Sequence, residues 1–116
     1  MSPQVTLKKS KEEIKKIRAR VVQDKSKILN PLEEKIKVIE KNIIDLEKEL
    51  SLNTERLIIA STEGNSLAIS EESKFNKVLK NKIECLYTEL DLDTKNFEQE
   101  SKCFKQLLEE LQENNL

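Results

Sequence analysis

The sequence predicts an all-α protein: an antiparallel two-helix coiled-coil hairpin with an additional basic N-terminal helix packed at its base. Two apolar rows carry this prediction, because steps that average 3.5 residues keep a narrow seam on one side of a helix. The first row is Leu32, Ile36, Ile39, Ile43, Leu46, Leu50, Leu57 and Ala60, and the second is Leu79, Ile83, Leu86, Leu90, Phe97, Phe104, Leu107 and Leu111. Segment 61–66 between the rows contains the only glycine of the chain, so the two helices can fold back on each other.

The first element is expected after a flexible linker remnant over residues 1–9, with residues 10–116 forming a single coiled-coil domain. Ser10 and Glu13 have the spacing of a capping box, which marks the start of a helix. A helical stripe follows, made of Ile14, Ile17, Val21 and Ile28. We therefore predict a first helix over about 10–29.

The second element begins at Asn30-Pro31. Asn30 is a good cap, and Pro31 fits the first turn of a helix, where its missing N–H costs nothing. These residues predict a break in the chain and a second helix over about 31–61. A continuous helix through Pro31 is the alternative.

The third element is a helix over about 68–113, capped by Ser66 or Ser70. A hairpin folded about residue 67 places Leu46 opposite the region of Leu86 and Leu90. The last turns of the third helix then extend beyond the second helix, and the first helix is expected to cover them. Three polar residues, Asn53, Asp93 and Glu100, fall on seam positions, where polar side chains commonly fix the register. A ligand-binding notch at these residues is the alternative.

The composition excludes most catalytic chemistry. The chain has no histidine, one glycine and two distant cysteines, Cys85 and Cys103, which argues against His-dependent catalysis, zinc sites and Gly-rich phosphate loops. We expect no enzyme, no catalytic residues, no metal site and no cofactor in this domain. The two cysteines are expected to be reduced surface thiols, and the absence of a long apolar run predicts a cytoplasmic protein that makes no contact with a membrane.

The charge is strongly asymmetric although the net charge is only −1. Residues 1–29 carry nine basic and three acidic side chains, whereas residues 87–116 carry eight acidic and three basic ones. Two explanations remain open: the basic segment neutralises the acidic end of the third helix, or its cations stay open. In the second case Lys8, Lys11, Lys15 and Arg18 form one stripe suited to phosphates.

The order of the motifs resembles the carboxy-terminal domain of ABC-F ATPases. A basic segment leads to Asn30-Pro31-Leu32-Glu33-Glu34-Lys35-Ile36, then to Leu52-Asn53, the turn Ala60-Ser61-Thr62-Glu63-Gly64-Asn65, Ile69 with Ser73-Lys74, and Ile83-Glu84-Cys85-Leu86-Tyr87-Thr88-Glu89-Leu90. One departure is Asn65-Ser66, where the family tends to have Asp-Gly. The resemblance implies that the chain is the excised tail of a larger ATPase whose two ATP-binding cassettes, which bind ATP and Mg²⁺, are not present.

The resemblance also implies a function. Such tails resemble arms that bind DNA or ribosomal RNA, so nucleic acid, the ribosome and the parent's own cassettes are the expected partners of a monomeric, non-catalytic arm. The expected nucleic-acid-binding residues are Lys8, Lys9, Lys11, Lys15, Lys16, Arg18 and Arg20. The alternative is a protein-interaction or dimerisation module that binds through Ile44, Ile58 and Ile59 and does not contact nucleic acid.

Overall fold

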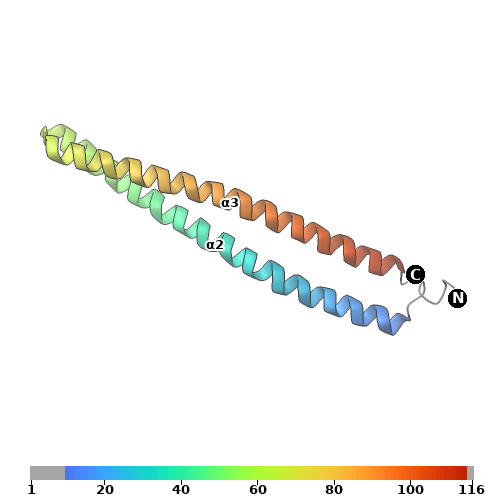
Figure 1. The fold of residues 1–116 in the computed structure, drawn as a ribbon. Helices are drawn as coiled ribbons and strands as arrows, with labels where there is room; N and C mark the ends of the chain where they lie inside the picture. The colour runs from blue at the N-terminus through green and yellow to red at the C-terminus, as the bar shows by residue number, and fades with distance from the viewer. Residues whose placement is uncertain (1–9, 115–116) are drawn as a thin grey trace. The chain divides into compact units, whose positions relative to one another are not determined.

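The computed structural model describes residues 10–114, and it confirms the all-α helical hairpin. Helix α2 spans Lys11–Glu63 and helix α3 spans Ser66–Asn114 (Figure 1). The expected linker at residues 1–9 lies outside the described part. The chain divides into two compact units, one formed by residues 35–93 and one by the two ends of the chain.

Helix α2 runs through Pro31 without interruption, so the expected break at Asn30-Pro31 is wrong and the alternative is correct. The predicted first and second helices are one element, and the basic segment is the beginning of α2 rather than a separate layer. A proline inside a helix removes one hydrogen bond and costs about 3 kcal/mol. Leu29 and Leu32 lie on one side of the helix, and a break between them would separate two adjacent seam positions.

The ends of both helices near the turn are closed by local hydrogen bonds. Gly64 has φ = 67°, and the N–H groups of Gly64 and Asn65 donate to the carbonyl oxygens of Ser61 (3.2 Å) and Ala60 (3.0 Å). This is the Schellman ending, which favours glycine at the left-handed position. The N–H of Ala68 donates to Asn65 Oδ1 at 3.1 Å, so Asn65 caps α3, rather than Ser66 or Ser70. At the start of α2, Ser10 Oγ accepts from the Glu13 N–H at 3.1 Å, as the capping box predicts.

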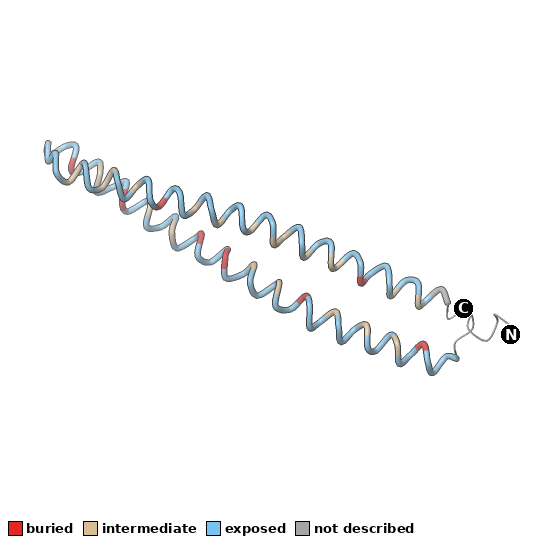
Figure 2. Tube along the Cα trace, in the orientation of Figure 1, coloured by how far each residue is buried: buried red, intermediate tan, exposed pale blue. Residues whose placement is uncertain are grey.

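The core is a single row along each helix, with exposed residues between its members (Figure 2). In the unit of residues 35–93 the buried side chains are Ile39, Ile43, Asn53, Ala60 and Leu79. In the other unit they are Ile14, Leu29 and Phe104. Every buried position except Leu29 falls on a predicted seam or, for Ile14, on the predicted stripe of the first helix, and the polar Asn53 is among them.

Two assignments of inward-facing residues, one in the first half of α2 and one near the end of α3, are wrong by one residue. Leu29 is buried and Ile28 is exposed, and Leu108 is half-buried whereas Leu107 is exposed. The row Ile17, Val21, Lys25 and Leu29 advances by four residues three times, because an undistorted helix has 3.6 residues per turn and drifts away from a strict 3.5 repeat.

A polar network near the turn fixes the register. Asn53 is fully buried, and its Nδ2 donates to the Glu72 backbone oxygen (3.0 Å) and to Glu72 Oε2 (2.6 Å). Asn76 Nδ2 donates to Asn53 Oδ1 at 2.8 Å, and Arg56 pairs with Glu72 at 3.1 Å. Further along, Lys35 pairs with Asp93 at 3.3 Å. The ends of the two helices at the turn centre the hairpin between Gly64 and Asn65 rather than on residue 67. The polar pairs are consistent with the register role expected of Asn53 and Asp93.

Candidate nucleic-acid interface

The basic segment forms the first turns of α2. Lys11, Lys15, Lys16, Arg18 and Arg20 are all exposed, whereas Lys8 and Lys9 lie outside the described residues. At a rise of 1.5 Å per residue, the five described cations occupy roughly 14 Å of helix. The helix therefore presents a dense group of cations to solvent.

These cations lie on two sides of the helix. Lys15 and Arg18 directly follow Ile14 and Ile17, so together with Lys11 they form a stripe beside the inward-facing row. Lys16 and Arg20 are four residues apart on the outer side of the helix. The described part of the predicted stripe, Lys11, Lys15 and Arg18, therefore lies on one side, and Lys16 and Arg20 are separate from it.

The acidic end of α3 belongs to the same compact unit as the basic segment. Among the side chains of residues 10–112, however, no ion pair within 4.0 Å joins a cation of residues 11–27 to a carboxylate. The acidic Glu98, Glu109 and Glu110 are themselves exposed. Direct neutralisation, the first explanation left open by the sequence, is therefore not found in the described residues.

The basic stripe has one exposed apolar neighbour that sequence reasoning missed. Val22 is 45% exposed, although it directly follows Val21 of the predicted inward stripe. Val22 lies one turn after Arg18 and continues the line of the cations. A helix that presents cations followed by an apolar side chain can contact the phosphates of a nucleic acid and also the apolar parts of its sugars.

The features outside the basic segment can be compared with the expectations from the sequence. Residues 10–114 contain no cluster of three or more His, Cys, Asp or Glu that could hold a metal ion, and Cys85 and Cys103 are free and exposed, as expected. None of the helices in this part of the chain is long and apolar enough to cross a membrane. The hydrogen bond that Tyr87 Oη donates to Glu47 Oε1, at 2.6 Å, raises the pKa of the Tyr87 phenol, and desolvation and the charge of Glu47 act in the same direction.

Comparison with known proteins adds no relative: no protein-family model, curated protein or solved structure matches this chain. The placement of the side chains and the motifs in the sequence are therefore the observations that bear on the function of this chain.

Proposed function

We propose that this chain is a non-catalytic helical arm that binds the phosphates of nucleic acid through the first turns of α2. One observation carries the proposal: five exposed cations, Lys11, Lys15, Lys16, Arg18 and Arg20, have no carboxylate partner within 4.0 Å among residues 10–112. Unpaired cations on a rigid helix bind a phosphate backbone by releasing its condensed counterions, and they need no base contact to do so.

The order of motifs along the chain supports a more specific proposal, the carboxy-terminal arm of a cytoplasmic ABC-F type ATPase. In that setting duplex DNA or ribosomal RNA is the ligand, and the attached cassettes bind ATP and Mg²⁺ outside this chain. The described part of the chain has no aromatic side chain within residues 10–27, so stacking on unpaired bases is not part of the proposed contact.

The test is a titration of fluorescently labelled duplex DNA and of structured RNA at several salt concentrations. The variant Lys11→Gln, Lys15→Gln and Arg18→Gln removes one stripe, and Lys41→Gln, Lys48→Gln and Lys74→Gln is its matched control, since these three lysines are exposed outside the basic segment. Each lost phosphate contact should lower the slope of log K against log salt by about 0.9, hence by nearly 3 for the stripe variant.

The unmodified chain and the control variant should bind with the same salt slope, and the stripe variant should bind more weakly to every sequence. Equal affinity of the two triple variants would show that the stripe is not the contact. If the unmodified chain binds neither ligand at low salt, the nucleic-acid function itself is wrong.

A further inference from the structure

A second surface, far along the chain from the basic segment, carries exposed apolar side chains. On α3, Val78, Cys85 and Leu92 follow one another at steps of seven residues, and all three are exposed (Val78 46%, Leu92 63%). On α2, Val38, Leu52 and Ile59 are 54%, 54% and 55% exposed. Steps of seven return to the same side of a coiled-coil helix, so each set forms a row along its helix.

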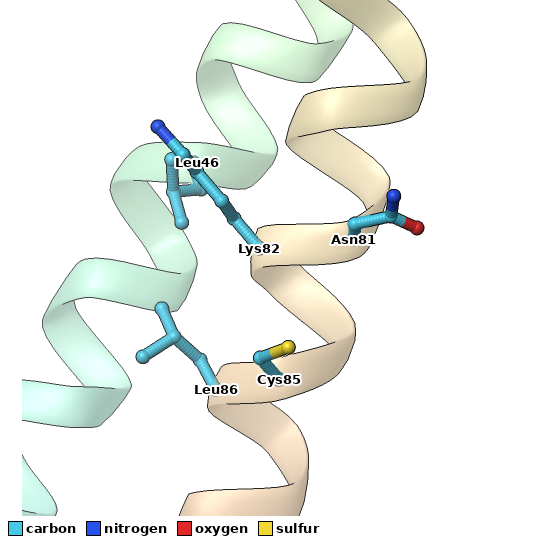
Figure 3. Close-up of a pocket in the computed structure, with 5 residues that line it drawn as sticks. All are labelled: Leu46, Asn81, Lys82, Cys85 and Leu86. Atoms are coloured by element: carbon cyan, nitrogen blue, oxygen red, sulfur yellow. The ribbon is translucent and has the colours of Figure 1, made fainter.

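The two rows open on the same side of the hairpin. Each of these residues directly precedes a seam position of its own helix, which is an apolar residue in four cases and the polar Asn53 or Asp93 after Leu52 and Leu92. Leu46 and Leu86 line one shallow hollow of about 390 Å³ together with Cys85. Figure 3 shows Leu46 on α2 and the other lining residues on α3, with the aliphatic stem of Lys82 extending toward Leu46.

We call this surface the apolar flank, and it consists of Val38, Leu52, Ile59, Phe75, Val78, Cys85 and Leu92. The opposite flank also exposes apolar side chains on α2, Ile44 and Ile58, but on α3 it carries the polar Tyr87, which hydrogen-bonds across to Glu47. A two-helix coiled coil needs only the seam, whereas a helix that also contacts a third helix carries an additional apolar row. The apolar flank therefore has the pattern of a surface that is covered by further helices.

The sequence of the α3 row indicates what covers it. Val78 precedes Cys85 by seven residues and Leu92 follows it by seven, while Lys82 and Glu89 are placed almost symmetrically on either side. A second α3 laid antiparallel across the first at Cys85 would bring Val78 opposite the second copy's Leu92 and Lys82 opposite the second copy's Glu89. Apolar residues then meet apolar residues and each cation meets an anion, which is the self-complementarity that a two-fold axis requires.

We propose that two copies of this chain pair through the apolar flank, antiparallel and about a two-fold axis at Cys85. On α2, Val38 and Leu52 are likewise symmetrical about Asp45, so the same axis brings them together. The same axis sets Asp45 of one copy against Asp45 of the other, and this like-charge pair disfavours close approach on α2, so the α3 row forms the middle of the contact. The proposal departs from the monomer expected from the sequence and is closer to the alternative, a dimerisation module, which named Ile59 of this flank together with Ile44 and Ile58.

The two cysteines provide a direct test with a matched control. The variant Cys103→Ser keeps only Cys85 at the proposed axis, and Cys85→Ser keeps only Cys103, which is also exposed but lies in the other compact unit. Each full-length variant is treated with a short bismaleimide cross-linker. Because pairing raises the local thiol concentration to about millimolar, Cys103→Ser should form covalent dimer about tenfold faster or more than Cys85→Ser. Equal rates would overturn the proposed axis.

Sedimentation of the unmodified chain at several concentrations tests the pairing itself. We expect a concentration-dependent dimer that Val78→Glu removes and that Ile44→Glu, on the opposite flank, leaves intact; both positions are exposed, so the helices should still form. Lys82→Glu should weaken the dimer, and adding Glu89→Lys should restore it. A monomer at all concentrations, or a dimer that Ile44→Glu removes and Val78→Glu does not, would refute the proposal; the first outcome would leave another protein's helix as the occupant of the flank.

Discussion

The substitution Asn53→Ala tests whether the polar network holds the hairpin in register. Asn53 is fully buried and makes three hydrogen bonds to α3: two to Glu72 and one from Asn76. The Glu72 carboxylate retains Arg56 at 3.1 Å after the substitution, whereas the half-buried amide of Asn76 loses its acceptor. The variant thus loses one charged and two neutral hydrogen bonds at a site from which water is largely excluded.

The magnitude follows from these bonds. A neutral hydrogen bond contributes about 1 kcal/mol and one to a charged group about 1.5 to 3 kcal/mol, so two neutral bonds and one charged bond predict a loss of about 3.5 to 5 kcal/mol in the free energy of unfolding. For a domain of this length, such a loss lowers Tm by about 10 °C or more. Circular dichroism at 222 nm, followed in urea and on heating at a fixed protein concentration, measures both quantities.

Asn42→Ala is the matched control, because Asn42 is an exposed asparagine on the same helix. Its unfolding free energy should change by no more than about 0.5 kcal/mol. A double-mutant cycle with Asn76→Ala isolates the bond between the two amides, and we expect a coupling of about 1 kcal/mol. If Asn53→Ala loses no more stability than Asn42→Ala, the network does not stabilise the hairpin and the reasoning fails.

Three further changes test individual parts of the fold. Gly64→Ala should cost about 1 kcal/mol in urea unfolding and Gly64→Asn less, since the strain comes from φ = 67° alone and a Cβ there meets nothing within 4 Å. The chain has one tyrosine and no tryptophan, so ultraviolet absorbance titrates Tyr87 alone; its pKa should lie above 10.0 and fall toward that value in Glu47→Gln. Because the folded pKa is raised, the stability that this hydrogen bond contributes is fully present below pH 10 and is lost as the pH rises through the folded pKa. Pro31→Ala should raise the unfolding free energy by up to about 3 kcal/mol, because it restores a helical N–H; a decrease would show that α2 requires the proline.

The hairpin could be predicted from the sequence because its signals are local and repeated. The spacing from Leu32 to Ala60 and from Leu79 to Leu111 identifies two helical seams, and Gly64 identifies the turn. The Ser10 cap is predictable for the same reason, since Ser10 and Glu13 interact within one turn. Each of these features depends on residues that are close together in the chain.

The errors arise where a local preference competes with packing. Asn30-Pro31 has the local chemistry of a helix start, but the seam continues on the same side past Pro31, and one lost hydrogen bond does not interrupt the helix. Asn65 caps α3 instead of Ser66 because the Schellman ending of α2 at Gly64 already fixes the next residue. Asn65 and Ser66 are both good N-cap residues, so capping preference alone cannot decide between them without the position of the α2 ending.

The candidate site was predictable only in part. The spacing of the apolar stripe places Lys15 and Arg18 beside the seam and Lys16 and Arg20 on the outer side of the helix. All four side chains are exposed in the structure. Whether these cations meet the carboxylates of α3 depends on the register between the helices, which the sequence placed about residue 67 instead of between Gly64 and Asn65. Of the apolar flank the sequence identified only Ile59; its α3 row was missed because Val78, Cys85 and Leu92 are seven residues apart and separately look like ordinary exposed positions.

The two proposals are carried by different residues and by different physical forces, so salt separates them. Phosphate contacts through Lys11, Lys15 and Arg18 weaken steeply as salt rises, because the release of counterions into a more concentrated salt solution gains less entropy. Burial of Val78 and Leu92 between two copies is driven by the removal of apolar surface from water, and excluded salts such as sulfate strengthen it. Lys82 and Glu89 lie at the edge of that contact and add only a small screened attraction. A chain that dimerises in high salt and binds nucleic acid in low salt would therefore satisfy both proposals. A dimer that dissociates in parallel with the nucleic-acid complex as salt rises would show that charge, and not the apolar flank, joins the two copies.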